Sequence, residues 1–333
     1  MGALSLAVGL VPVVLFLLAL MVMDSYKLVT RPAVLTGIGA GVLAASACYA
    51  IHVALLQGGR VDPDVVRRWI APLVEEGAKG IFVVWLIRAS RVGFMVDAGI
   101  LGFAAGTGFA LAENLYYAQA LQDLGIGLWL VRGLGTAIMH GSTTAAFGIV
   151  SKSLSDRRGV SRLDAFLPGY ALAAVVHALF NYVVLSPLVA TGVLLVSMPL
   201  FIVTVFEQSE RATADWLGRS FDTGIELLES IESGAITDSP LGRYLSSLHR
   251  FPGPVVADML CLLRVHAELA LRAKGVLIAR SAGVVVPLDD EVKAKFAELH
   301  FLERSIGKTG RMALQPFLSR AGRDVWQLEL LRQ

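Results

Sequence analysis

The sequence predicts an all-α membrane protein, in which a polytopic bundle of about seven membrane-spanning helices precedes a C-terminal cytoplasmic helical domain. Three observations lead to this prediction. First, the 333 residues are 55% hydrophobic and only 17% charged, whereas a soluble protein carries about 25% charged residues. Second, the apolar excess lies in residues 1–206, and residues 207–333 have the composition of a soluble chain. Third, the apolar segments reach the roughly 20 residues that a bilayer requires.

Each candidate span is bounded by charged or turn-forming residues. Residues 3–23 lack the basic start and the cleavage site of a signal peptide, so we expect a retained first span. The residues just before the third span predict a helix that is capped by Asp62 and has Pro63 as its first residue. The predicted spans are residues 3–23, 33–57, 69–88, 94–118, 128–151, 164–186 and 188–206.

Basic residues are distributed unequally between the two sets of loops. Nine lysines and arginines lie on the side of the first loop, against three on the other side. The positive-inside rule therefore predicts a multi-pass plasma-membrane protein with its N-terminus outside and its C-terminus in the cytoplasm. The nine are Lys27, Arg31, Arg88, Arg91, Lys152, Arg157, Arg158, Arg162 and Arg211, and the three are Arg60, Arg67 and Arg68.

The segment 207–333 carries apolar residues at helical spacing among charges, as in "VVADMLCLLRVHAELALRAKG". Glycine and proline separate such stretches, so we expect four to six amphipathic helices, which could bind a cytoplasmic partner. The formal net charge of +2 is too small to indicate nucleic-acid binding. Cys48 and Cys261 lie far apart and match no disulfide or zinc pattern.

Ionisable and amide side chains recur inside the predicted spans, where each costs a few kcal/mol unless it is paired or functional. The third span holds Glu75, Glu76 and Lys79. At about 1.5 Å per residue, Glu75 lies roughly 10 Å below the outer surface. Polar residues of three other spans fall in the same outer half of the bilayer, which indicates one site rather than scattered structural groups. These residues are Glu113, Asn114, His140, His177 and Asn181.

Carboxylates, imidazoles and an amide at one depth suit general-base activation of water, with donors for a developing oxyanion. The spans contain neither a nucleophile in a G-x-S-x-G context nor an H-E-x-x-H zinc pattern. We therefore expect no metal or other cofactor, although glutamate and histidine could bind zinc in principle. Asp97 and Arg132 lie near span ends and are interpreted as structural. Thr143 and Thr144 are expected to bond their own helix backbone.

Two other hypotheses fit the same residues. A proton-coupled transporter or channel could use the carboxylates and histidines as a relay, although the sequence shows no paired inverted repeats with broken helices. A non-catalytic membrane scaffold could present the cytoplasmic helices to partners, with Glu75 and Lys79 as a buried ion pair that only fixes the packing.

Four motifs, in this order, resemble those of the PrsW-type intramembrane proteases, relatives of the CAAX prenyl endopeptidase and bacteriocin-processing superfamily. The motifs are "EEGAK" at Glu75–Lys79, "FALAEN" at Phe109–Asn114, the single His140, and "HALFN" at His177–Asn181. They lie within residues 65–185, so the tail after 207 is outside the resemblance. The resemblance implies metal-independent glutamic proteolysis in the membrane, with a membrane-anchored protein such as an anti-sigma factor as the substrate of a first, site-1 cut.

The resemblance also implies roles for individual residues. Glu75 and Glu76 supply the base, and His177 with Asn181 lines the oxyanion site. CAAX-type members carry a histidine in place of Glu113, and this departure argues against a prenyl-protein substrate.

The remaining site residues are assigned from their chemistry. Glu113 and His140 are expected to position the water or to protonate the leaving amine. Lys79 is expected to tune the charge of the glutamates. Phe109 and Asn114 are expected to support these groups. The sequence leaves open which of the two adjacent glutamates is the base.

Overall fold

Every regular element among the described residues of this computed structural model is helical, which confirms the predicted all-α class. The structure describes residues 3–332 apart from 58, 60, 121–124, 159–161, 183–184, 285, 288–289, 316 and 319–321. Arg60, one of the predicted loop cations, lies outside this set. The chain forms two compact units, Met1–Glu210 and Arg211–Gln333.

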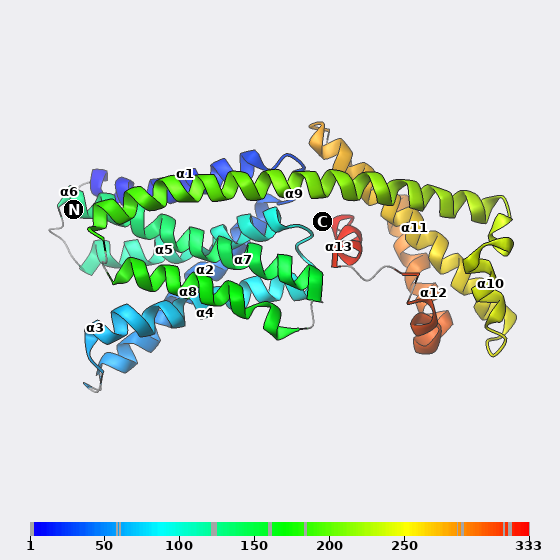
Figure 1. The fold of residues 1–333 in the computed structure, drawn as a ribbon, viewed down its shortest axis with the longest axis horizontal. Helices are drawn as coiled ribbons and strands as arrows, with labels where there is room; N and C mark the ends of the chain where they lie inside the picture. The colour runs from blue at the N-terminus through cyan, green and yellow to red at the C-terminus, as the bar shows by residue number, and fades with distance from the viewer. Residues whose placement is uncertain are drawn as a thin grey trace. The chain divides into compact units, whose positions relative to one another are not determined.

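The helices of the first unit match the first four predicted spans to within two residues at each end, and the later three differ more. The fifth span was predicted to end at 151, whereas α7 continues to Arg158, and the sixth was predicted to end at 186, whereas α8 ends at Asn181. The helix that begins at the last predicted span continues well beyond residue 206. The residues that follow, "EQSERATADWL", contain no glycine or proline, so they allow the helix to continue. In chain order (Figure 1), the elements are α1 (Ala3–Met23), α2 (Arg31–Gln57), α3 (Pro63–Val65), η1 (Val66–Ile70), α4 (Ala71–Arg88), α5 (Met95–Ala120), α6 (Ile126–Leu130), η2 (Val131–Thr136), α7 (Ala137–Arg158), η3 (Leu163–Ala165), α8 (Leu167–Asn181) and α9 (Pro187–Glu232).

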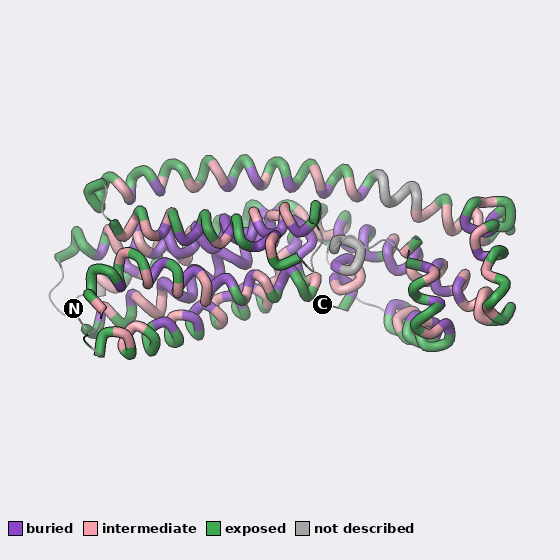
Figure 2. The backbone as a smooth tube through the Cα atoms, turned by 60° about the horizontal axis from the view of Figure 1, so that its bottom comes forward, coloured by how far each residue is buried: buried purple, intermediate pink, exposed green. Residues whose placement is uncertain are grey.

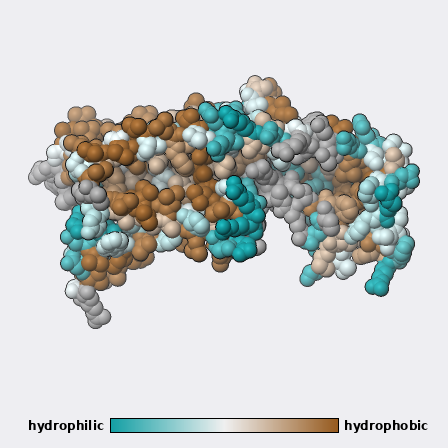
Figure 3. Space-filling view, in the orientation of Figure 1, coloured by the Kyte–Doolittle hydropathy of each residue, from teal (hydrophilic) through white to brown (hydrophobic). Residues whose placement is uncertain are grey.

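Five helical segments in the described part of the chain are long and apolar enough to cross a membrane: Leu4–Met23, Arg31–Gln57, Met95–Ala120, Leu163–Asn181 and Pro187–Gly218. The other two predicted spans are also helical, but they carry the polar residues of the site. Hydrophobic side chains cover most of the visible face of the first unit (Figure 3). These features indicate a membrane protein.

The central helix of the first unit is α5. Of its most apolar window, 83% is buried inside the protein, against 22% for α1. Buried residues gather where the helices of this unit face one another, and exposed residues lie outside (Figure 2). Glycines allow the close approach: a Cβ atom on Gly106 would lie 2.2 Å from the carbonyl oxygen of His140, and one on Gly102 would lie 2.6 Å from that of Thr144. The small residues of α5 therefore set its distance from α7.

Replacement of Gly106 by alanine is expected to destabilise the bundle by about 1–3 kcal/mol, because the added methyl group must push α5 away from the α7 backbone. The matched control is Gly39→Ala on α2, where an added Cβ meets no atom within 4 Å. Thermal unfolding of both variants in one detergent checks this expectation. Equal melting temperatures for the two variants would contradict the close packing of α5 and α7.

Two short π-helical turns, η1 and η2, precede α4 and α7. The first follows the predicted cap: the Asp62 carboxylate accepts a hydrogen bond from the backbone nitrogen of Asp64 at 2.7 Å, and Pro63 begins the helix. A π turn contains about one residue more than an α turn and is frequent at functional sites.

In the described residues of the second unit, four amphipathic helices follow the end of α9, which agrees with the four to six expected. They are α10 (Pro240–Ser247), α11 (Gly253–Ser281), α12 (Asp290–Leu314) and α13 (Gly322–Leu330). Its core includes Met259, Leu262 and Leu302, all at most 5% exposed.

Candidate active site

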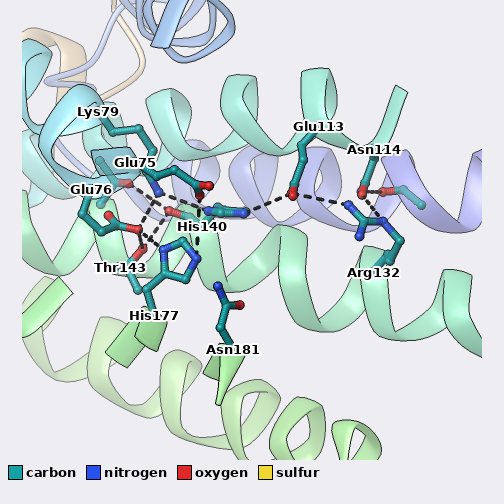
Figure 4. A network of polar contacts seen from close by, with 12 residues as sticks. Glu75, Glu76, Lys79, Glu113, Asn114, Arg132, His140, Thr143, His177 and Asn181 are labelled. Atoms are coloured by element: carbon teal, nitrogen blue, oxygen red, sulfur yellow. Dashed lines mark hydrogen bonds and ion pairs between the residues drawn. The ribbon is translucent and has the colours of Figure 1, made fainter. Parts of the chain in front are cut away.

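A pocket of about 610 Å³ lies among the helices of the first unit, at the end of the bundle that carries α3 and α6. Predicted site residues line it from four helices: Glu75 from α4, Glu113 from α5, His140 from α7, and His177 with Asn181 from α8. Glu76 lies next to Glu75, behind this lining. Figure 4 shows these side chains in one continuous network of polar contacts. Residues up to about 100 positions apart in the sequence thus meet at one place.

Glu76 is the enclosed member of the glutamate pair, with a side chain that is 0% exposed. One of its oxygens, Oε1, receives three contacts. Lys79 Nζ lies at 2.7 Å, His177 Nδ1 at 2.8 Å and Thr143 Oγ1 at 3.1 Å. Its carboxylate is therefore held by an ion pair and two hydrogen bonds, and it does not line the pocket.

Glu75 is the member of the pair that faces the pocket. Its Oε2 lies 3.7 Å from His177 Nε2, and its Oε1 lies 4.0 Å from Nδ1 of His52 on α2. Both distances exceed a hydrogen bond, so this carboxylate is not fixed by a close partner. Glu75 and the free face of His177 are thus directed to the same part of the pocket.

His140 occupies the centre of the network and is 1% exposed. Its Nδ1 lies 3.2 Å from Lys79 Nζ, and its Nε2 lies 3.2 Å from Glu113 Oε2. The Phe109 ring supports both groups: its centroid lies 4.8 Å from that of the imidazole and 4.9 Å from Lys79 Nζ. Phe109 therefore contributes a cation–π contact and a packing surface, which agrees with a supporting place beside the site.

Arg132 contacts the network directly, although the sequence interpretation treated it as structural. Its guanidinium lies 3.4 Å from Glu113 Oε2 and donates from Nε to Asn114 Oδ1 at 2.9 Å. The same group lies 3.8 Å from the Tyr117 ring centroid. Asn114 in turn donates to the Gly9 carbonyl at 2.8 Å, which links the arrangement to α1.

Asn181 lines the pocket at a greater distance from the glutamates. Its amide nitrogen donates to the Arg67 carbonyl at 3.1 Å, and one further N–H remains for a ligand. Asp97, in contrast, lies outside the site: it accepts from the backbone nitrogens of Gly93, Phe94 and Ala98 at the start of α5. Its structural interpretation agrees with these contacts.

Sequence reasoning missed His52 and one contact of Thr143. His52 lines the pocket, and its Nε2 is buried without a hydrogen-bond partner among the described residues. A titratable residue within the apolar segment 33–57 was a signal that could have identified it. Thr143 does bond the carbonyl of His140 in its own helix, but it also donates to Glu76. Only the tertiary structure reveals this second contact.

A metal ion is one group that these residues could hold. Ligand atoms of Glu75, His140 and His177 all lie within 4.8 Å of one another. His177 is suitably oriented, because the Glu76 carboxylate accepts from Nδ1 and leaves Nε2 toward Glu75. His140 is not, because Lys79 paired with Glu76 is an ammonium that can only donate to Nδ1.

The proton of the neutral His140 ring therefore lies on Nε2, directed at Glu113, and neither nitrogen keeps a free lone pair. A catalytic zinc site takes three protein ligands and leaves one position open. In this hydrogen-bonded arrangement the three residues supply two free donors, so they do not fit a catalytic zinc ion as they stand.

Comparison with known proteins gives one match. A family model described as "PrsW family intramembrane metalloprotease" matches residues 25–206, more than half of the chain and all the residues of the network except the Gly9 carbonyl. No curated protein and no solved structure matches the chain.

Proposed function

The chain belongs to the PrsW family of intramembrane proteases, and we propose that it is an endopeptidase that cuts a membrane-anchored protein with glutamate-activated water. An anti-sigma factor cut at a first site is the substrate class that the motifs suggest. The resemblance to the CAAX and bacteriocin-processing superfamily belongs to the same proposal. So does the orientation with the N-terminus outside, which puts the α3–α6 end of the bundle at the outer face.

One observation carries the mechanism: Glu75 lines the pocket without a close partner, whereas Glu76 is enclosed and ion-paired. A general base must reach the water and must be free to take its proton. Glu75 meets both conditions and Glu76 meets neither. Glu75 is therefore the base in this proposal, a choice that the sequence left open.

Glu76 acts through His177. Its carboxylate accepts from Nδ1, which fixes the ring so that Nε2 faces Glu75 and the pocket. A neutral His177 in this tautomer can accept at Nε2 the proton that Glu75 has taken from the water, and the protonated ring can then transfer it to the leaving amine. Lys79 keeps Glu76 ionised, which is the charge-tuning role expected for it.

Glu113, His140 and Asn181 complete the site. Glu113 faces the pocket beside His140, where its carboxylate can accept a hydrogen bond from the water and so position it. Asn181 offers its remaining N–H to the developing oxyanion. Asn114 accepts a hydrogen bond from Arg132, and Arg132 forms an ion pair with Glu113. Asn114 therefore supports the site indirectly, through Arg132.

The proposed mechanism needs no metal ion, although the family description contains the word metalloprotease. The hydrogen bonds of His140 support this choice, because they leave two free donors in the Glu75–His140–His177 group. No step of the mechanism passes through a metal.

The proposal is tested with purified protein in liposomes and a panel of tagged single-span proteins that resemble anti-sigma factors. Fragments are identified by mass spectrometry, with and without EDTA, beside the Glu75→Gln/Glu76→Gln variant. Wild type is expected to produce fragments at the same rate in both conditions, and the variant none. Loss of cleavage with EDTA, restored by zinc, would contradict the metal-independent mechanism. Equal cleavage by the variant would contradict the glutamate mechanism.

The transporter alternative makes the opposite prediction. It expects pH-dependent proton flux into the same liposomes and no peptide fragment. Absence of fragments from every panel protein together with such flux would replace the protease proposal.

A further inference from the structure

The pocket extends away from the glutamates as a trough between the second half of α2 and the second half of α5. On α2 it is lined at Cys48, His52 and Leu56, one residue per helical turn toward the end of that helix. On α5 it is lined from Phe109 through Ala112 and Tyr116. The trough therefore starts at the catalytic residues and opens at the α3–α6 end of the bundle.

The length of the trough fits a short extended peptide. Eight residues of α2 separate Cys48 from Leu56, which at about 1.5 Å per residue is roughly 12 Å. An extended chain advances about 3.3 Å per residue, so the trough holds about four residues.

Polar groups of the trough lack partners within the protein. Among the described residues, the hydroxyl groups of Tyr49, Tyr116 and Tyr117 make no hydrogen bond, and His52 Nε2 is buried without one. Such groups in an apolar environment normally find a partner. An extended segment inside a membrane also has unpaired backbone N–H and C=O groups, each of which costs several kcal/mol. The two sets of unpaired groups complement each other.

Tyr49 and Tyr116 bridge the trough from its two sides. Their ring centroids lie 5.1 Å apart in a tilted contact, one ring from α2 and the other from α5. Both side chains line the pocket, yet both residues are about half exposed, at 52% and 46%. These exposed fractions place both rings at the edge of the pocket, and a chain that enters the pocket between α2 and α5 has to separate them.

We propose that the trough is the substrate-binding site, that it takes about four extended residues from the end of a substrate's membrane span, and that the Tyr49–Tyr116 contact closes its edge between α2 and α5 until the substrate enters. This inference rests on the proposed protease function, since it assigns the substrate segment for the same catalytic residues. It predicts a substrate whose chain unwinds next to the outer end of its span.

Binding is tested separately from cleavage by photo-crosslinking. A benzophenone amino acid replaces Tyr49 in the inactive Glu75→Gln/Glu76→Gln protein, which is reconstituted with each panel protein and illuminated. The control carries the same amino acid at Leu43, which is 72% exposed on α2 and does not line the pocket. We expect adducts with a panel protein from position 49 but not from 43, mapped to the residues beside the outer end of its span. Equal adducts from both positions, or adducts at 49 with lipid alone, would overturn the proposal.

The closing contact is tested by a reversible link. Tyr49→Cys/Tyr116→Cys is made in a Cys48→Ala/Cys261→Ser background, whose own rate is the reference, and a short bifunctional methanethiosulfonate joins the two thiols. Cleavage by the double variant is expected to fall at least tenfold on linking and to recover with dithiothreitol, whereas the same treatment of each single-cysteine variant should change its rate much less relative to that variant untreated. Unchanged cleavage by the linked protein would overturn the gate. Should wild type cut no panel protein, the protease function fails, and adducts at 49 but not 43 would still establish the binding site.

Discussion

Replacement of Glu75 by glutamine is expected to lower the cleavage rate by about 10²–10⁴-fold and to leave the fold intact. Glutamine keeps the size of the side chain but cannot take a proton from water. The nearest partners of the Glu75 carboxylate lie at 3.7 and 4.0 Å, so the substitution breaks no close hydrogen bond. Initial rates in liposomes and the melting temperature in detergent measure the two effects.

The neighbouring glutamate is the control for this experiment. Glu76→Gln should reduce both activity and stability, because it removes the charge that pairs with Lys79 and orients His177. A Glu75→Gln protein with nearly wild-type activity, beside an inactive but stable Glu76→Gln protein, would exchange the two roles.

Replacement of Lys79 by methionine is expected to destabilise the protein by about 3–5 kcal/mol, because it leaves the Glu76 carboxylate buried without its cation. Both side chains of this pair are 0% exposed, so water cannot replace the lost partner. The cation–π contact of Lys79 with Phe109 disappears as well. Chemical denaturation in detergent micelles measures the loss.

The double variant Glu76→Gln/Lys79→Met separates the charge effect from packing. Replacing a buried ion pair by neutral groups of similar size is often close to neutral for stability. The double variant should therefore recover most of the stability that Lys79→Met loses, yet remain inactive because His177 is no longer held by a carboxylate. If the double variant were as unstable as Lys79→Met, packing rather than charge would explain the loss.

The fold was predictable because hydrophobic length is a strong signal in a membrane protein. The first four predicted spans correspond to helices whose ends lie within two residues of those expected. The close approach of α5 to α7 depends on Gly102 and Gly106, and only the tertiary structure reveals that these two glycines face α7. The end of α9 was not predictable from hydropathy, because a helix continues wherever propensity allows, whether or not its residues remain apolar.

The core of the site was predictable for a related reason. Charges are costly in hydrocarbon, so Glu75, Glu113 and His177 were expected to lie at one site. The similar depth of these residues in their three spans predicted its position in the outer half of the bilayer. The contact of Arg132 with Glu113 was not predictable, because a long side chain near a span end can reach the membrane interface instead. The π turn η2, which contains Arg132, also changes the angle between Arg132 and His140 from that of a regular α-helix.

The π turn at η2 also makes the contacts of Glu113 depend on the number of residues in this segment. Arg132 and His140 are eight residues apart, which in a regular α-helix places them about 80° apart around the axis. The wider turn winds less per residue, so both side chains can contact Glu113 Oε2, at 3.4 and 3.2 Å. Because the π turn contains about one residue more than an α turn, deletion of one residue in Val131–Thr136 would leave a regular α-helix in which the two residues, then seven positions apart, lie about 20° apart around the axis. Insertion of one residue would instead rotate Arg132 by about 100° relative to His140. Insertions should therefore be tolerated less in this turn than single deletions.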